Sequence, residues 1–276
     1  MAVHLDLNAM NTTDTHDLHD RVFVISGAAG GLGSTVAGLL AAAGARLLLT
    51  DRDPAALERV RAGLGAAAGR AAVQAGDITD AALGRRLGAS ALETFGRLDG
   101  GVSAAGVIFF APVLELGEKE WDTTMAVNLR GTFFFIQGLA RTMVDAGTAG
   151  SIVSVSATSA NGPRPNNADY AASKHAVEHI TRTFALDLAP RGIRVNAVSP
   201  GVIPTPMWEK VDRERGAILG LKEGELTRAM AEKIPLGRIG RTAEIAEGIV
   251  FFLSGRSSFA TGQVLTVDGG FNLANA

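Results

Sequence analysis

Residues 26–33 read Ser-Gly-Ala-Ala-Gly-Gly-Leu-Gly and stand between a short apolar run and an Ala-rich helical pattern. Because glycine has no side chain, Gly27, Gly31 and Gly33 let the backbone turn tightly and let an anionic ligand approach the start of the helix. The free N–H groups and the dipole of a helix N-terminus favour a pyrophosphate. This stretch, Leu32 included, predicts the cradle of a dinucleotide.

Outward from this cradle, short apolar runs alternate with longer helical patterns, which indicates a parallel sheet covered on both faces. The expected strands are 21–26, 46–50, 71–75, 98–103, 151–155, 193–198 and 264–267. The expected helices are 32–43, 80–95, 121–145, 169–188 and 242–253. This order predicts an α/β fold, a single doubly wound Rossmann-type domain with a seven-stranded parallel sheet and helices on both faces.

Nothing inside the 276 residues has the composition of a linker, so we expect one domain over residues 20–276, preceded by a flexible N-terminal tail over 1–19. The segment 202–236 interrupts the alternation with three prolines, several charges and scattered apolar residues. We expect this segment to be a mobile lid over the substrate.

Composition excludes several classes of function. A net charge of −2 without a basic run argues against nucleic acid, and the absence of cysteine excludes disulfides and thiolate chemistry. The chain shows neither a secretory signal nor an apolar stretch long enough for a membrane span, so we expect a cytoplasmic protein with no membrane partner. No His, Asp and Glu cluster has metal-ligand spacing, so we expect no metal site.

The acidic residue after the second expected strand points to the cofactor. Asp51 lies about 20 residues beyond the glycine stretch, where a carboxylate can accept hydrogen bonds from the ribose hydroxyls of the adenosine half. It would repel a 2'-phosphate, so NAD is favoured over NADP, although the neighbouring Arg52 can soften this preference. Asp77 and Ile78, at the end of the third expected strand, have the position of an adenine contact.

A second chemical signal is Tyr170-Ala-Ala-Ser-Lys174, which on a helix places the phenol and the ammonium one turn apart on one face. A phenol with an ordinary pKa near 10 is a poor base at neutral pH. A nearby ammonium and a positively charged nicotinamide lower the pKa of the phenol, so Tyr170 can act as the general acid or base and take the proton of an alcohol.

From about Asp20 through Phe271 the chain resembles the classical short-chain dehydrogenase/reductase (SDR) family. The resemblance rests on the glycine stretch as a TGxxxGxG-type loop, on Tyr170 to Lys174 as YxxxK, and on Asn128 in Val-Asn-Leu-Arg-Gly. Ser-Pro-Gly at 199–201 and Asp-Gly-Gly at 268–270 also fit.

The resemblance implies roles for further residues. Lys174 would also hold the nicotinamide ribose, and Asn128 would anchor a proton-relay water. The backbone of Ile203 and the hydroxyl of Thr205 would orient the nicotinamide carboxamide, and Gly106 would line the cofactor trough. The family also suggests a homotetramer, with segments 169–188 and 263–267 at the subunit contacts.

Two departures from the family pattern stand out. The catalytic serine of the family commonly lies 13 residues before the tyrosine, which falls here on Ala157. Ser156 and Ser159 are the candidate substitutes, with Ser156 taken as the fourth catalytic residue. The family's Asn-Asn-Ala-Gly after the fourth strand reads Ser-Ala-Ala-Gly at 103–106.

Substrate contacts are expected from Ser159, Phe109, Met207 and Trp208, which form a partly apolar pocket for a small molecule. We expect oxidoreduction of a secondary alcohol, polyol, diol or cyclic hydroxy compound with NAD. The alternatives are a 3-oxoacyl-thioester reductase that uses NADPH, and a catalytically silent dinucleotide-binding protein suggested by Ala157.

Overall fold

A seven-stranded parallel sheet forms the centre of the molecule, with strand order β3-β2-β1-β4-β5-β6-β7. The computed structural model describes residues 18–162 and 164–274. The strands are β1 (Val22–Ser26), β2 (Arg46–Thr50), β3 (Ala71–Val73), β4 (Gly100–Ser103), β5 (Gly150–Val155), β6 (Ile193–Pro200) and β7 (Val264–Val267). The predicted fold class is confirmed.

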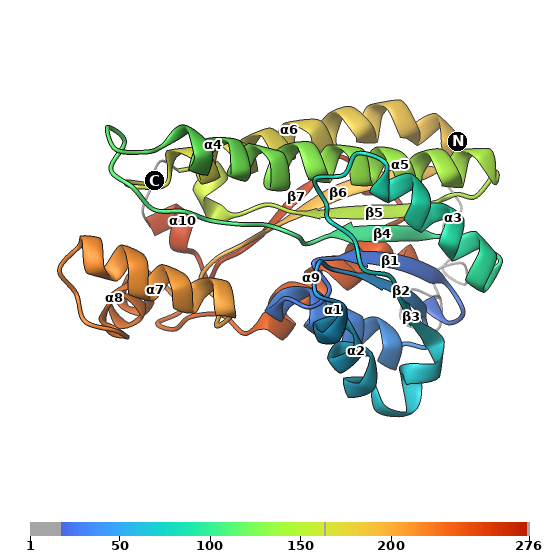
Figure 1. Cartoon of the computed structure of the whole chain (residues 1–276), viewed down its shortest axis with the longest axis horizontal. Helices are drawn as coiled ribbons and strands as arrows, with labels where there is room; N and C mark the ends of the chain where they lie inside the picture. Colours follow the sequence, from blue (N-terminus) through green and yellow to red (C-terminus); the bar gives the residue numbers. More distant parts are fainter. Residues whose placement is uncertain (1–17, 163, 275–276) are drawn as a thin grey trace, which may run out of the picture.

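Helices cover both faces of this sheet (Figure 1). On one face lie α3 (Leu83–Phe95), α4 (Glu118–Thr124), α5 (Thr132–Asp145) and α6 (Ala168–Leu188). On the other lie α1 (Gly31–Ala42), α2 (Pro54–Gly63) and α9 (Thr242–Leu253). Side chains of a strand point alternately to the two faces, so Phe23 and Ile25 of β1 join one core while Val22 and Val24 join the other.

Local polar contacts explain where helix boundaries differ from the pattern. The helix expected from residue 80 begins at Leu83, because Asp80 Oδ1 accepts a hydrogen bond from Ala82 N (2.9 Å) and closes a turn first. The helix expected over 121–145 is α4, a π-helical turn (Met125–Gly131) and α5. Helix α2 was not predicted, although Asp53 caps it and Pro54 occupies its first turn.

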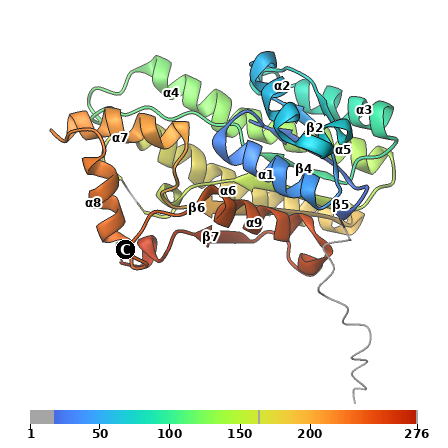
Figure 2. The same ribbon diagram turned by 90° about the horizontal axis from the view of Figure 1, so that it is seen from below.

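The segment 202–236 contains two helices, α7 (Pro206–Ile218) and α8 (Glu225–Lys233), which project beside the sheet (Figures 1 and 2). Asp212 joins them, because its carboxylate accepts hydrogen bonds from Gly224 N (2.5 Å) and Thr227 N (2.8 Å). Lys210 Nζ donates to the carbonyl of Ile108 (2.7 Å) and thereby fastens α7 to the loop after β4.

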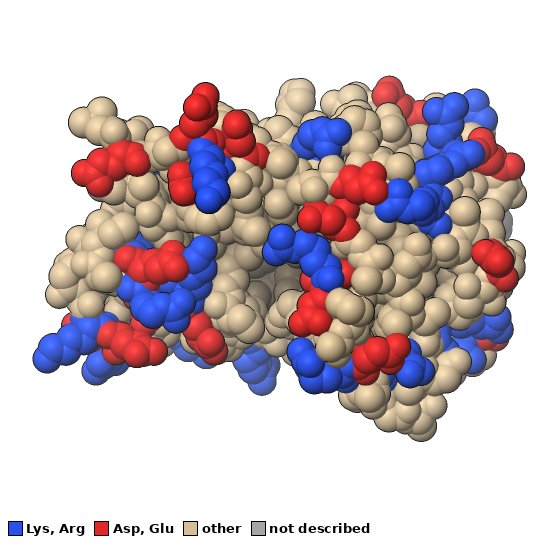
Figure 3. Space-filling view, in the orientation of Figure 1, with Lys and Arg blue, Asp and Glu red and all other residues tan. Residues whose placement is uncertain are grey.

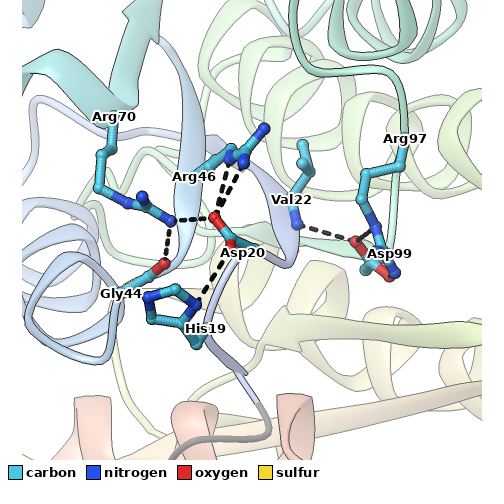
Figure 4. Close-up of polar contacts among 8 residues, drawn as sticks. All are labelled: His19, Asp20, Val22, Gly44, Arg46, Arg70, Arg97 and Asp99. Carbon is cyan, nitrogen blue, oxygen red and sulfur yellow. Dashed lines mark hydrogen bonds and ion pairs between the residues drawn. The ribbon is translucent and has the colours of Figure 1, made fainter.

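The ordered body extends further toward the N-terminus than expected. Residues 1–17 of the predicted tail lie outside the described residues, but Leu18 is 1% exposed in the core. Asp20 Oδ1 accepts hydrogen bonds from Arg46 Nη2 (2.9 Å) and Arg70 Nη2 (2.6 Å), which tie the entry to β1 to its neighbours (Figure 4). Residues 18 and 19, which were expected in the tail, therefore belong to the folded body, because burial and ion pairing hold this stretch.

Within the part of the chain that the structure describes, no helix combines the length and the apolarity needed to cross a membrane. A short last helix, α10 (Phe271–Ala274), follows β7.

Candidate active site

A cavity of about 410 Å³ opens at the carboxyl ends of the central strands. The strand order reverses between β1 and β4, and the crevice at such a switch point is where open α/β sheets bind ligands. The space-filling view shows this face hollowed between the α7–α8 pair and the sheet body (Figure 3). The lining comes from the glycine turn, the ends of β2 and β5, the loops after β4 and β6, α6, α7 and α10.

The glycine turn has the shape of a phosphate cradle. Gly27 has φ +67°, and a Cβ there would lie 2.5 Å from Ala105 N. A Cβ on Gly33 would collide with the carbonyl oxygen of Gly27. Helix α1 starts at Gly31 with no side chain capping it, so its first N–H groups are available to an anion. The turn therefore fits the pyrophosphate of a dinucleotide.

Two carboxylates mark the expected adenosine end of the cavity. Asp51 Oδ2 accepts a hydrogen bond from Ala29 N (3.2 Å), which holds the carboxylate beside the glycine turn. The Thr79 N–H, which donates to Asp77, lowers the pKa of the Asp77 carboxyl, so this group is charged at neutral pH. Arg52 and Ile78 line the same end. The predicted cofactor residues are thus brought together with the cradle.

Asn128 is fully buried in the π-helical turn, where its side-chain amide bridges two elements. Its Oδ1 accepts from Val107 N (2.8 Å), and its Nδ2 donates to Val107 O (2.9 Å) and Ser173 Oγ (3.1 Å). A Cβ on Gly106 would lie 3.4 Å from Asn128 Oδ1. Asn128 therefore holds the loop after β4 against α6, and its role toward a relay water stays a prediction.

Tyr170 and Lys174 lie one turn apart on α6, and both line the cavity while being 9% and 4% exposed. Lys174 Nζ donates to Val155 O (2.8 Å) and lies 5.7 Å from the centroid of the Tyr170 ring. Burial raises the pKa of Tyr170 to about 12 and lowers the pKa of Lys174 to about 8. The free-energy cost of burying either charge falls when the opposite charge forms beside it. The pair can therefore hold a phenolate next to an ammonium, which suits the transfer of one proton.

Ser156, predicted as the fourth catalytic residue, lines the cavity, but its hydroxyl is directed toward α6. Its Oγ donates to Glu178 Oε1 (2.9 Å) on α6, and a hydroxyl has a single proton to donate. Ala157 follows, and then the short 3₁₀ turn Thr158–Ala160. Within this turn, Ser159 lines the cavity, and its Oγ is buried with no hydrogen-bond partner in the structure. Of the two candidates, Ser159 has the hydroxyl that is available.

Most of the remaining predicted residues line the cavity, but Phe109 does not appear among the described lining residues. Ile203, Thr205, Met207 and Trp208 line the cavity. Thr205 Oγ1 caps α7 by accepting from Trp208 N (3.2 Å), which leaves its own proton free to be donated. Phe109 is not among the lining residues that the structure describes. The centroid of its ring lies 4.6 Å from Lys210 Nζ, and Phe110 lines the cavity.

Several lining residues were not predicted individually, although Val211 and Arg215 lie in the segment 202–236 that was expected to cover the substrate. Val211 and Arg215 follow Met207 at intervals of four, so the helical period of α7 carried a signal for both. Arg164 and Phe271 also line the cavity. They come from loops and chain ends that no periodicity identifies. Among the described residues, no group of three or more metal-type side chains comes together.

Known proteins share this fold and sequence. The family model described as enoyl-(acyl carrier protein) reductase matches residues 27–272. A galactitol 2-dehydrogenase (L-tagatose-forming) of Cereibacter sphaeroides is 39% identical over 252 residues, 90% of this chain and 94% of the relative. A 3-oxoacyl-(acyl-carrier-protein) reductase of Thermotoga maritima is 36% identical over 253 residues, 92% and 98% of the two chains.

A short-chain type dehydrogenase/reductase from Mycobacterium marinum has a crystal structure that superposes with a TM-score of 0.85 at 32% identity, over 94% of this chain and 98% of that one. The chain belongs to the short-chain dehydrogenase/reductase family, whose members are oxidoreductases that bind a nicotinamide dinucleotide.

Proposed function

We propose that the protein is an NAD-dependent dehydrogenase that interconverts a secondary alcohol and the corresponding ketone, with Tyr170 as general acid and base. The observation that carries the proposal is the buried Tyr170–Lys174 pair in the wall of the cavity whose other end holds Asp51 beside the glycine turn. The bound nicotinamide would supply the hydride acceptor or donor.

The chain's own residues supply the path for the proton and orient the substrate. Tyr170 takes the hydroxyl proton of the alcohol in oxidation and returns it to the ketone oxygen in reduction. The charge of Lys174 stabilises the phenolate. The hydroxyl of Ser159 donates to the substrate oxygen, the role that Ala157 cannot fill, and Met207 and Trp208 cover the apolar part of a small polyol, diol or cyclic hydroxy compound.

The test is reduction of NAD and of NADP, followed by absorbance, across secondary alcohols, polyols and cyclic diols. We expect turnover with NAD and weaker turnover with NADP. Cofactor binding without turnover of any compound would favour the alternative suggested by Ala157, a dinucleotide-binding protein without catalytic activity.

A 3-oxoacyl-thioester reductase that uses NADPH is the second candidate, supported by the relative of that name and by Arg52 at the cavity wall. Asp51 counts against it, because a fixed carboxylate repels a 2'-phosphate. A strong preference for NADPH together with reduction of an oxoacyl thioester would replace the first proposal with this one.

We also propose a homotetramer that uses α6 and β7. The outer face of α6 is hollowed beside Ala172, His175 and His179, and Leu186 on this helix is 78% exposed. A partner subunit would cover these side chains. Light scattering coupled to size exclusion would give four times the mass of the chain if the proposal holds.

A further inference from the structure

The charged side chains that line the cavity differ between its two ends. Asp51 follows β2 and Asp77 follows β3, at one edge of the sheet. At the end near β7 and α10, the charged lining residues in the described part of the chain are Arg164, Lys174 and Arg215. Among the described residues no carboxylate lines this end, whereas at the other end Arg52 stands beside Asp51 and Asp77.

Arg164 is held in place by residues of the C-terminal segment. Its Cζ lies 4.9 Å from the centroid of the Phe271 ring, and its Nη2 donates to Asn272 Oδ1 (2.9 Å). Asn272 Nδ2 in turn donates to the carbonyl of Thr158 (3.2 Å), beside Ser159. These contacts fix the guanidinium between α10 and the turn that carries Ser159.

Arg215 on α7 is a charged group without a counter-charge. Its Nε is buried with no hydrogen-bond partner, and within the described residues no carboxylate forms an ion pair with it. Burial, and after it the positive charge of Arg164, lower its pKa. Since a guanidinium still stays protonated at neutral pH, the ligand-free protein bears the cost of this charge. An anion between the two arginines would remove that cost.

We propose that Arg164 and Arg215 bind an anionic oxygen group on the substrate, a carboxylate or a phosphoester, while Tyr170 acts on its hydroxyl group. The inference rests on the proposed function and narrows it from neutral polyols to hydroxy acids or phosphorylated polyols. A guanidinium fork matches the two oxygens of either group, and charge-assisted bonds of this kind are the strong ones.

Kinetics on matched substrates tests the proposal. The experiment compares three sets of substrates of the same chain length: hydroxy acids, phosphorylated polyols and neutral polyols. It uses the parent, Arg215→Met and the control variant Arg213→Met, which replaces an exposed arginine on the same helix. We expect the parent to prefer one acidic set, and the two sets identify whether the group is a carboxylate or a phosphoester. Arg215→Met should lower kcat/KM for that set on the order of 10- to 100-fold and spare neutral polyols, while Arg213→Met changes neither.

Binding and melting measurements separate this inference from the proposed function. Calorimetry with the NADH-loaded protein should show that Arg215→Met loses the hydroxy acid or phosphate but keeps NADH. Without ligand, Arg215→Met should melt at the same or a higher temperature, because it removes an unpartnered charge. If the acid binds through Arg215 but is not turned over, the proposed function is contradicted while the inference about the two arginines stands. Equal loss of acidic and neutral substrates, or a parent preference for neutral polyols, would overturn the inference.

Discussion

Ser156 Oγ donates a hydrogen bond to Glu178 Oε1 at 2.9 Å, and both residues are 1% exposed. Glu178 Oε1 also accepts from Asn161 Nδ2 (3.1 Å), so the contact belongs to the packing between the loop after β5 and α6. The proton of Ser156 is thus used in packing, while the buried hydroxyl of Ser159 has no hydrogen-bond partner among the described residues.

The two serines should therefore respond differently to removal. Ser159→Ala should lower kcat by about 100-fold with NADH affinity unchanged, because a donor to the developing oxyanion is lost. Ser156→Ala should instead lower the free energy of unfolding by about 1–3 kcal/mol, because Glu178 loses a buried donor. Steady-state kinetics and urea denaturation measure the two effects. The reverse pattern, or a large gain of rate in Ala157→Ser, would show that Ser159 does not supply the hydroxyl.

Replacing Lys174 tests its expected roles toward the Tyr170 phenol and the nicotinamide ribose, and it also tests the burial of its charge. Lys174→Met should abolish most turnover and weaken NADH binding, since the ammonium would serve both the phenol and the nicotinamide ribose. Burial lowers the pKa of Lys174 from 10.5 to about 8, so the unfolded chain holds the proton to higher pH than the folded one. The free energy of unfolding of the ligand-free parent should therefore increase as pH rises from about 8 to 10.5, and decrease as pH falls through the same range.

Thermal melts across this pH window check the prediction. Lys174→Met lacks the titrating group, so its profile should rise less than that of the parent. Parallel profiles for the two proteins would mean that Lys174 is not buried as the structure has it.

Asp51 should decide the choice between the two cofactors. Asp51→Ser removes the charge that would face a 2'-phosphate and leaves Arg52 beside it, so the NADP-to-NAD ratio of kcat/KM should rise on the order of tenfold or more. Asp53→Ser is the matched control, since Asp53 caps α2 two residues further on. An unchanged ratio in Asp51→Ser would contradict the adenosine-end assignment.

The sequence predicted most of the fold because the strands are short apolar runs with clear ends. The segments 46–50, 264–267 and 242–253 match β2, β7 and α9 residue for residue. The pattern failed where side chains override periodicity. Asp80 delays the start of α3, and the buried amide of Asn128 lies in a π-helical turn that no apolar repeat signals.

The site was predictable where motif spacing follows the backbone, as at the glycine turn and at Tyr170 and Lys174. It was not predictable where a contact depends on the path of a loop. Phe109 and Phe110 are neighbours in the sequence, and only Phe110 lines the cavity in the described part of the chain, while the Phe109 ring packs against Lys210. Arg164 lines the cavity and donates a hydrogen bond to Asn272, 108 residues away along the chain, a contact that no local pattern predicts.

Asp99 lies at the amino ends of the central strands β1 and β4, and its replacement should affect stability alone. Its Oδ2 accepts from Val22 N (2.8 Å) and Arg97 Nε (2.8 Å) at the entry to β4 (Figure 4). Asp99→Ala leaves the buried Val22 N–H without a partner and should cost about 1–3 kcal/mol of unfolding free energy. Urea denaturation measures the loss, and calorimetry should find NADH affinity unchanged. Equal stability to the parent would contradict this anchoring role.

Tyr170 is proposed to move the substrate proton. The most direct measurement is NAD reduction by Tyr170→Phe beside the parent, on any alcohol that the parent oxidises, with NADH affinity measured by calorimetry on both proteins. Loss of turnover with NADH affinity nearly intact is the predicted result, because only the hydroxyl is removed from the cavity wall. Turnover comparable to that of the parent would show that Tyr170 is not the general acid and base.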